Sequence, residues 1–199
     1  MKQISFLLVA MTAAGTGLLG CSSSSGGESG ESLSPGAHPD AGASDVFVPT
    51  AETFDCLKNA EWTQVGASVY KNVLGHTAEM LAVANSPDGG VFPEGTVVQL
   101  VPYEANVKRA PGYSPASHDW EFFSLNVAAS GTTIKTSGGN AQVLSMFGGG
   151  SCLSCHTMAA PQWDLVCGDE DGGNTHGCQS LPFSGDQLAM TRATDPRCK

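Results

Sequence analysis

Three residues late in the chain could do chemistry together: two cysteine thiols and the imidazole that directly follows the second thiol. They lie in the segment Cys152-Leu153-Ser154-Cys155-His156. Two thiols at this spacing can add across the two vinyl groups of a haem, and the adjacent imidazole can coordinate the iron from the proximal face. The pattern therefore predicts one covalent c-type haem, with Cys152 and Cys155 as the thioether positions and His156 as the metal ligand.

The same cysteine pair could instead form a redox disulfide of the thioredoxin type. Such pairs open a helix that follows a strand in a βαβ unit. The sequence before Cys152 is rich in glycine and shows no such alternation. Haem attachment is therefore the favoured prediction, and the redox disulfide is the alternative.

What a haem does depends on the position opposite the proximal histidine. A methionine or histidine there favours electron transfer, whereas an open position favours binding of small molecules. Met158 follows His156 too closely to reach the opposite face. None of the others stands in a recognised ligand motif, so each is expected to be a core or surface residue: Met80, Met146, Met190, His76 and His118.

The amino end has the features of an export signal. Lys2 gives a positive start, residues 4–14 form an apolar run, and Leu18-Leu19-Gly20-Cys21 follows. This order resembles a bacterial lipoprotein signal, which implies removal of residues 1–20, lipidation of Cys21, and attachment to the outer membrane or to the periplasmic face of the cell envelope. An ordinary signal peptide is the alternative. A transmembrane helix is disfavoured, because glycines interrupt a run that is already short.

Residues 21–50 predict a flexible linker between the lipidated cysteine and the folded domain. Up to about residue 45 they are mostly Ser, Gly, Pro, Ala and Glu, which cannot bury enough apolar surface to offset the entropy of ordering. Residues 51–199 are enough for one hydrophobic core. The net charge of −10 with nine Lys and Arg argues against nucleic acid as a partner.

The seven cysteines of the chain divide by these roles. Lipidation and haem attachment use three, which leaves Cys56, Cys167, Cys178 and Cys198. An exported domain sits where free thiols oxidise, so two disulfides are expected, although four cysteines allow three pairings. We predict Cys167 with Cys178 and Cys56 with Cys198. The alternative is a metal site made from Cys167, Cys178 and His176. The acidic residues between Cys167 and Cys178 lack the pattern of a calcium loop, so a disulfide-closed surface loop is favoured there.

The rest of the domain is predicted to be mainly β (α+β), an antiparallel sheet with a few short helices. β-branched and aromatic runs alternate with turns rich in Gly and Pro. Strands are predicted at residues 65–70, 96–101, 105–109, 120–127 and 132–136, and helices at residues 77–85 and 141–147. A sheet of this kind would hold the haem at one side or end, on a helix that carries the cysteine motif.

Five segments, in this order, resemble the cytochrome P-460 family: residues 68–70, 92–97, 104–108, 119–122 and 152–156. The resemblance implies an antiparallel β fold, usually a homodimer, and a five-coordinate haem with an open distal face. Family members bind or convert small nitrogen or oxygen species such as nitric oxide and hydroxylamine. Glu104 matches the distal carboxylate credited with proton transfer, so it is the catalytic candidate. Its alternative role is that of a solvated strand residue.

One position departs from the family pattern. The hydroxylamine-oxidising members carry a lysine that cross-links to the haem. The aligned position in this chain is Leu100, or Gln99 if the alignment shifts by one residue. Lys108 aligns with a different lysine that forms no cross-link. The departure favours a ligand-binding or redox haem protein over a hydroxylamine oxidase. It also suggests an apolar distal pocket, for which the candidate residues are Leu100, Phe92, Phe122 and Phe123.

Three functions are therefore consistent with the sequence. The first is an exported haem protein whose open iron binds or converts small nitrogen or oxygen species, either as a ligand-binding protein or as a haem oxidoreductase. The second is an electron-transfer lipoprotein with one haem. The third is a structural lipoprotein without haem, in which disulfides join all six cysteines that follow Cys21.

Overall fold

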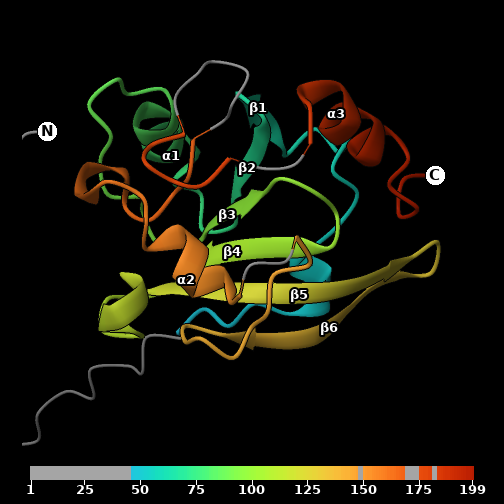
Figure 1. Ribbon diagram of the computed structural model, residues 1–199. Helices are drawn as coiled ribbons and strands as arrows, with labels where there is room; N and C mark the ends of the chain where they lie inside the picture. The colour runs from blue at the N-terminus through green and yellow to red at the C-terminus, as the bar shows by residue number, and fades with distance from the viewer. Residues whose placement is uncertain (1–45, 148–149, 169–174, 181–182) are drawn as a thin grey trace, which may run out of the picture. The chain divides into compact units, whose positions relative to one another are not determined.

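The computed structural model describes residues 46–147, 150–168, 175–180 and 183–199. The predicted export signal, Cys21 and most of the predicted linker lie outside these residues. Figure 1 shows an antiparallel sheet with short helices around it. Within the described ranges, no helix has the length and apolar character needed to cross a membrane.

Each strand of the sheet pairs with the next one along the chain, and every pairing is antiparallel. The mainly β prediction is therefore confirmed. The strands are β1 (Thr63–Val65), β2 (Ser68–Asn72), β3 (Thr96–Gln99), β4 (Glu104–Lys108), β5 (Trp120–Ala128) and β6 (Gly131–Gly138). The helices are α1 (Thr77–Ala84), α2 (Cys152–His156) and α3 (Gly185–Ala193), with 3₁₀ turns η1 (Ala51–Thr53), η2 (Pro115–Ser117) and η3 (Pro161–Trp163).

Some of the predicted elements are wrong, each for a local reason. The strand predicted at residues 65–70 is two strands, because Gly66 adopts a positive φ and turns the chain between β1 and β2. The helix predicted at residues 141–147 does not form. The backbone N–H of Cys152 donates to the Val143 carbonyl at 2.9 Å and Leu144 bridges Ser151, so pairing with the residues at the start of α2 overrides helix propensity.

Both faces of the central strands β2 to β5 are largely buried, which explains why neighbouring residues in these strands are often both apolar. Successive side chains point to opposite faces, so each pair of neighbours contributes to two cores. The core on the α2 side includes Tyr70, Phe92, Val98, Trp120, Phe122 and Cys152. The core on the opposite side includes Phe54, Trp62, Val69, Val97, Val107 and Phe123.

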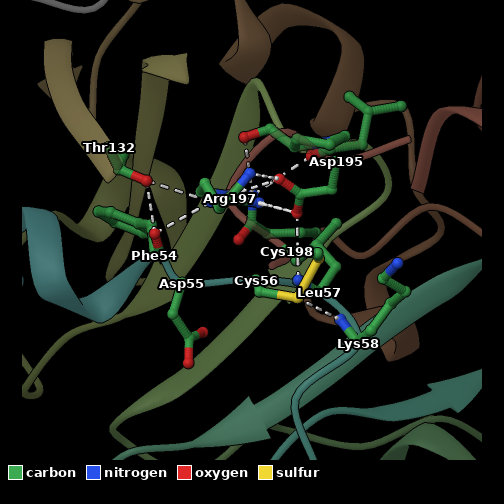
Figure 2. A network of polar contacts seen from close by, with 12 residues as sticks. Phe54, Asp55, Cys56, Leu57, Lys58, Thr132, Asp195, Arg197 and Cys198 are labelled. Carbon is green, nitrogen blue, oxygen red and sulfur yellow. Dashed lines mark hydrogen bonds and ion pairs between the residues drawn. A yellow bond between two sulfur atoms is a disulfide. The ribbon is translucent and has the colours of Figure 1, made fainter. Parts of the chain in front are cut away.

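The two ends of the folded domain are joined by a disulfide and a buried polar network (Figure 2). Cys56 and Cys198 form the disulfide, as predicted. The guanidinium of Arg197 donates to the Asp195 carboxylate at 2.7 Å and to the Phe54 carbonyl at 3.0 Å. The first and last segments of the domain are therefore tied to each other beside β6.

Candidate functional site

Helix α2 brings the three residues of the cysteine motif onto one side. Cys155 and His156 follow Cys152 by three and four residues, the spacing of neighbours on a helix surface. Ser151 caps the amino end of the helix, because its hydroxyl accepts a hydrogen bond from the Ser154 backbone N–H at 3.1 Å. In Figure 1 this helix lies over β4 and β5, and the predicted helix carrying the motif is therefore present.

The motif opens into a cavity of about 390 Å³, within the range of ligand-binding pockets. The cavity is bounded by the sheet, by α2, by the segment after α2 and by α3. Its lining is more apolar than polar. In chain order, the main residues that line the cavity are Val98, Leu100, Glu104, Asn106, Phe147, Cys152, Cys155, His156, Val166, Phe183 and Leu188.

The imidazole of His156 is held in one orientation. Its Nδ1 lies 2.7 Å from the Leu165 carbonyl oxygen, so Nδ1 carries the proton and donates. Nε2 then carries a lone pair, which accepts a long hydrogen bond from the Asn106 side-chain nitrogen at 3.5 Å. Burial lowers the pKa of His156 and keeps the ring neutral. This is the tautomer that a metal-binding histidine needs, with its other nitrogen fixed by a carbonyl.

Cys152 and Cys155 are both free of disulfide bonds. Burial, together with the nearby charge of Glu104, raises the pKa of Cys152 to about 12. Redox cysteines of the thioredoxin type need the opposite shift, toward a stable thiolate. The described residues also contain no βαβ unit, so the structure disfavours the redox disulfide.

Glu104 lines the same cavity from the beginning of β4. Its carboxylate accepts a hydrogen bond from the Met146 backbone N–H. Burial raises the pKa of Glu104, although bonds from Met146 and Ser145 oppose the shift. Glu104 is therefore a half-buried acid facing the cavity, and it could hold a proton there.

The two residues considered for the cross-linking register face opposite ways. Leu100 lines the cavity. Gln99 is buried away from it, and its amide nitrogen donates to the Glu104 carbonyl at 3.0 Å. Lys108 forms a buried ion pair with Asp164 at 2.7 Å. Among the residues that line the cavity in the described structure, no lysine occurs.

The phenylalanines proposed for an apolar distal pocket lie elsewhere. Phe92 belongs to the core on the α2 side and Phe123 to the opposite core. Phe122 contacts the motif itself, since its ring centroid lies 5.0 Å from that of His156. Leu100 is the member of the proposed group that lines the cavity.

The candidate sixth ligands are not in the cavity lining of the described structure. Met80 is fully buried in the core, whereas Met146, Met158 and Met190 are exposed. His76 and His118 carry side chains that are about half exposed, and each lies near an acidic residue, Glu79 or Asp164. The internal stretches outside the described residues contain no methionine or histidine in sequence.

Cys167 and Cys178 form a disulfide, which confirms that pairing and contradicts the alternative metal site at these residues and His176. His176 instead stacks on Trp163, with ring centroids 3.6 Å apart. No cluster of three metal-ligating side chains occurs in the described ranges. Most of the acidic loop considered for calcium lies outside these ranges.

Several residues of the cavity were missed by the sequence reasoning. Asn106 could have been found, because it shares a face of β4 with Glu104 by strand alternation. Phe183 and Leu188 could not, since they follow the motif by many residues and carry no chemical pattern. The Ser184 cap and its reciprocal partner Gln187 were a readable signal for α3 that went unused.

Comparison with protein-family models, with curated proteins and with solved structures found no match.

Proposed function

We propose that this protein is an exported, lipid-anchored cytochrome with one c-type haem, whose open iron site binds or converts small nitrogen or oxygen species. Nitric oxide and hydroxylamine are the ligands implied by the resemblance to the cytochrome P-460 family. The observation that supports the proposal most is the placement of two free thiols and a neutral, carbonyl-fixed imidazole on one wall of a single cavity.

The residues of the cavity fit such a group. Cys152 and Cys155 would hold it through thioether bonds, and His156 would bind its iron through Nε2. Haem iron supplies ligand binding and electron exchange when it is bound. Three disulfides, as the haem-free hypothesis requires, would need a bond between Cys152 and Cys155, whereas both are free.

The remaining residues would shape the ligand site. Leu100, Phe147 and Phe183 make part of the wall apolar, which favours small, weakly hydrated ligands. Glu104 would take up or give a proton at its carboxylate, since burial raises its pKa toward neutrality. With no methionine or second histidine in the described lining, the arrangement supports ligand binding over electron transfer.

Anchoring at Cys21 and a homodimeric assembly belong to the same proposal. The anchor rests on the sequence alone, because residues 1–45 lie outside the described ranges, and the homodimer rests on the resemblance to the cytochrome P-460 family. Mass spectrometry of the exported chain tests the anchor: a mature protein beginning at a diacylated or triacylated Cys21 supports it, and an unmodified Cys21 contradicts it.

Haem attachment is tested on the full chain produced in a host that installs c-type haem. The intact mass should rise by one haem, and the Cys152→Ala, Cys155→Ala double variant should lose the adduct. The matched control is the exposed Met158→Leu substitution, which should keep it. A colourless wild-type protein without added mass would contradict the proposal.

The open site is tested by the visible spectrum of the reduced protein with and without carbon monoxide. We expect a high-spin spectrum that changes on adding the gas, and no change of spin state in Met146→Leu or Met190→Leu. A six-coordinate, low-spin spectrum that turns high-spin in one of these variants would instead identify an electron carrier.

A further inference from the structure

The carbonyl that fixes His156 belongs to an unusual piece of backbone. Asp164 and Leu165 both have positive φ angles, 49° and 60°, and both are non-glycine residues. This left-handed conformation costs roughly 1–2 kcal/mol for most residues, with Asp tolerated better than Leu. Two such residues in a row persist only where the surroundings hold them. The direction of the Leu165 carbonyl is therefore imposed by tertiary contacts.

Asp164 supplies those contacts. Its carboxylate accepts from Lys108 Nζ at 2.7 Å and from the Phe92 backbone N–H at 3.0 Å. Its own carbonyl accepts from Trp120 Nε1 at 2.7 Å. The turn that carries Leu165 is thus fastened to β4, to β5 and to the segment before β3.

Two further contacts extend this attachment. Lys108 Nζ also donates to the His118 carbonyl at 2.7 Å and lies 5.2 Å from the centre of the Trp120 ring. The Gly90 backbone N–H donates to the Gln162 carbonyl at 2.9 Å. Gly89 packs so closely against Gln162 that a Cβ atom would lie 2.2 Å from that carbonyl oxygen, so the turn before β3 supports the same segment.

We propose that the buried Lys108–Asp164 pair is the positioning device for the haem ligand: it holds the Asp164–Leu165 turn so that the Leu165 carbonyl fixes His156 Nδ1. The proposal rests on the proposed function, because it assigns Lys108 and Asp164 a role toward the iron ligand of that same site. Neither residue is among those that line the cavity, so both would act through His156.

The expected consequence is a shift in the properties of the iron. A firmly held Nδ1–H···O=C bond raises the basicity of the other ring nitrogen, which strengthens its bond to the metal and favours the ferric state. Loosening the turn should weaken the hydrogen bond and stabilise the ferrous state. The effect should appear in the midpoint potential and in the iron–histidine stretching frequency, which global stability alone does not set.

The experiment uses a charge-free double variant, Lys108→Met with Asp164→Asn, in the full haem-loaded chain. Removing both charges avoids an unpaired buried ion, so the fold should survive, and Asn tolerates the left-handed region. The matched control is Lys71→Met with Asp55→Asn, which removes a second buried lysine paired with an aspartate at 2.8 Å on the opposite face of the sheet.

We expect the Lys108/Asp164 variant to move the ferric–ferrous equilibrium about tenfold toward the ferrous form, roughly the effect of one lost hydrogen bond. For one electron, tenfold is about 59 mV upward. The iron–histidine stretch should fall, and the Lys71/Asp55 control should change neither reading. Should the double variant fail to fold, Trp120→Phe removes the bond to the Asp164 carbonyl and the indole beside Lys108 but keeps both charges of the pair. Its control is Trp62→Phe, which removes the corresponding indole from Asp55 and Lys71.

An unchanged potential and stretching frequency in a folded variant would overturn the proposal, as would an equal shift in the control. The imidazole ¹⁵N resonances of His156 in a haem-free Cys152→Ala, Cys155→Ala background separate this failure from that of the proposed function. We expect a single Nδ1-protonated tautomer there, becoming mixed when Lys108 and Asp164 are replaced. If the wild type carries no haem but this tautomer change occurs, the proposed function fails and the positioning role stands.

Discussion

Two groups of the same three residue types lie on opposite faces of the sheet. On the α2 side, Lys108 pairs with Asp164 at 2.7 Å and lies over Trp120. On the other side, Lys71 pairs with Asp55 at 2.8 Å and lies over Trp62. In each group the tryptophan Nε1–H donates to the aspartate, to its backbone in the first and to its carboxylate in the second.

The two groups differ in burial and in what they hold. The Lys108 and Asp164 side chains are 7% and 3% exposed, whereas Asp55 is 30% exposed beside a Lys71 that is 6% exposed. The first group fixes a left-handed turn next to His156. The second fixes the segment that enters the domain next to Cys56. The comparison shows that the same arrangement, a lysine held between a carboxylate and an indole, can fix either the backbone beside His156 or the first segment of the folded domain.

Each group also has a disulfide beside it, and the largest expected effect is the difference between these two bonds. Cys56–Cys198 closes 142 residues and Cys167–Cys178 closes 11. In the chain-entropy account, the long loop corresponds to roughly 5 kcal/mol of stability and the short one to less than about 3 kcal/mol. We predict that Cys56→Ser with Cys198→Ser lowers the free energy of unfolding far more than Cys167→Ser with Cys178→Ser, measured by urea denaturation.

Under the proposed function, the spectrum of the protein with haem attached should reverse this ranking. The Cys167 sulfur lies 4.0 Å from His156 Nδ1, whereas the Cys56–Cys198 bond lies among the residues that join the chain ends (Figure 2). Loss of the short-loop disulfide should therefore change the iron–histidine stretch, and loss of the long-loop disulfide should leave it unchanged. Equal losses of stability, or a spectral change in the wrong variant, would remove the division between the two regions.

The next effect in size concerns single substitutions of the two aspartates. Asp164→Asn leaves Lys108 as an unpaired charge in a buried site, which should cost about 3–5 kcal/mol. Asp55→Asn leaves Lys71 near water and 3.8 Å from the Glu61 carboxylate, so we expect a loss of only about 1–2 kcal/mol. Equilibrium urea unfolding at neutral pH measures both. A larger loss for Asp55→Asn would show that burial does not set the ranking.

The same two regions show how far the sequence could predict the structure. The cysteine motif and the antiparallel sheet followed from residue types and spacing, because each has a local chemical signature. The number of disulfides followed from the even set of four remaining cysteines, but the predicted pairing was one of three that the sequence allows, and the structure contains that pairing. The support of His156 did not follow from the sequence. It depends on the ion pair of Asp164 with Lys108, which lies 56 residues away in the sequence, and on backbone angles that no propensity predicts for Leu165. The cavity wall formed by Phe183 and Leu188 was hidden for the same reason.

The smallest effect is the pH dependence of stability. Asp55, beside Lys71, and Glu104, in the cavity on the α2 side, should contribute to it with opposite sign. Burial alone would raise the pKa of Asp55, but hydrogen bonds from Lys71, Asn59 and Trp62 outweigh it, and the pKa lies below the ordinary value of 3.8. The unfolded state therefore binds more protons, and this contribution is lost as the pH falls below about 4.

Glu104 behaves in the opposite way, since burial raises its pKa above the ordinary 4.5. Its contribution is complete below that value and declines as the pH rises through the raised pKa, because the folded state then holds the proton more tightly than the unfolded state. We predict that Asp55→Asn flattens the acid limb of the stability profile and that Glu104→Gln flattens the decline above about pH 4.5. Urea unfolding of the three proteins between about pH 3 and 8 measures both slopes. If Glu104→Gln leaves the upper slope unchanged, the carboxylate is not the group that titrates in the cavity, and its proposed part in proton transfer loses its physical basis.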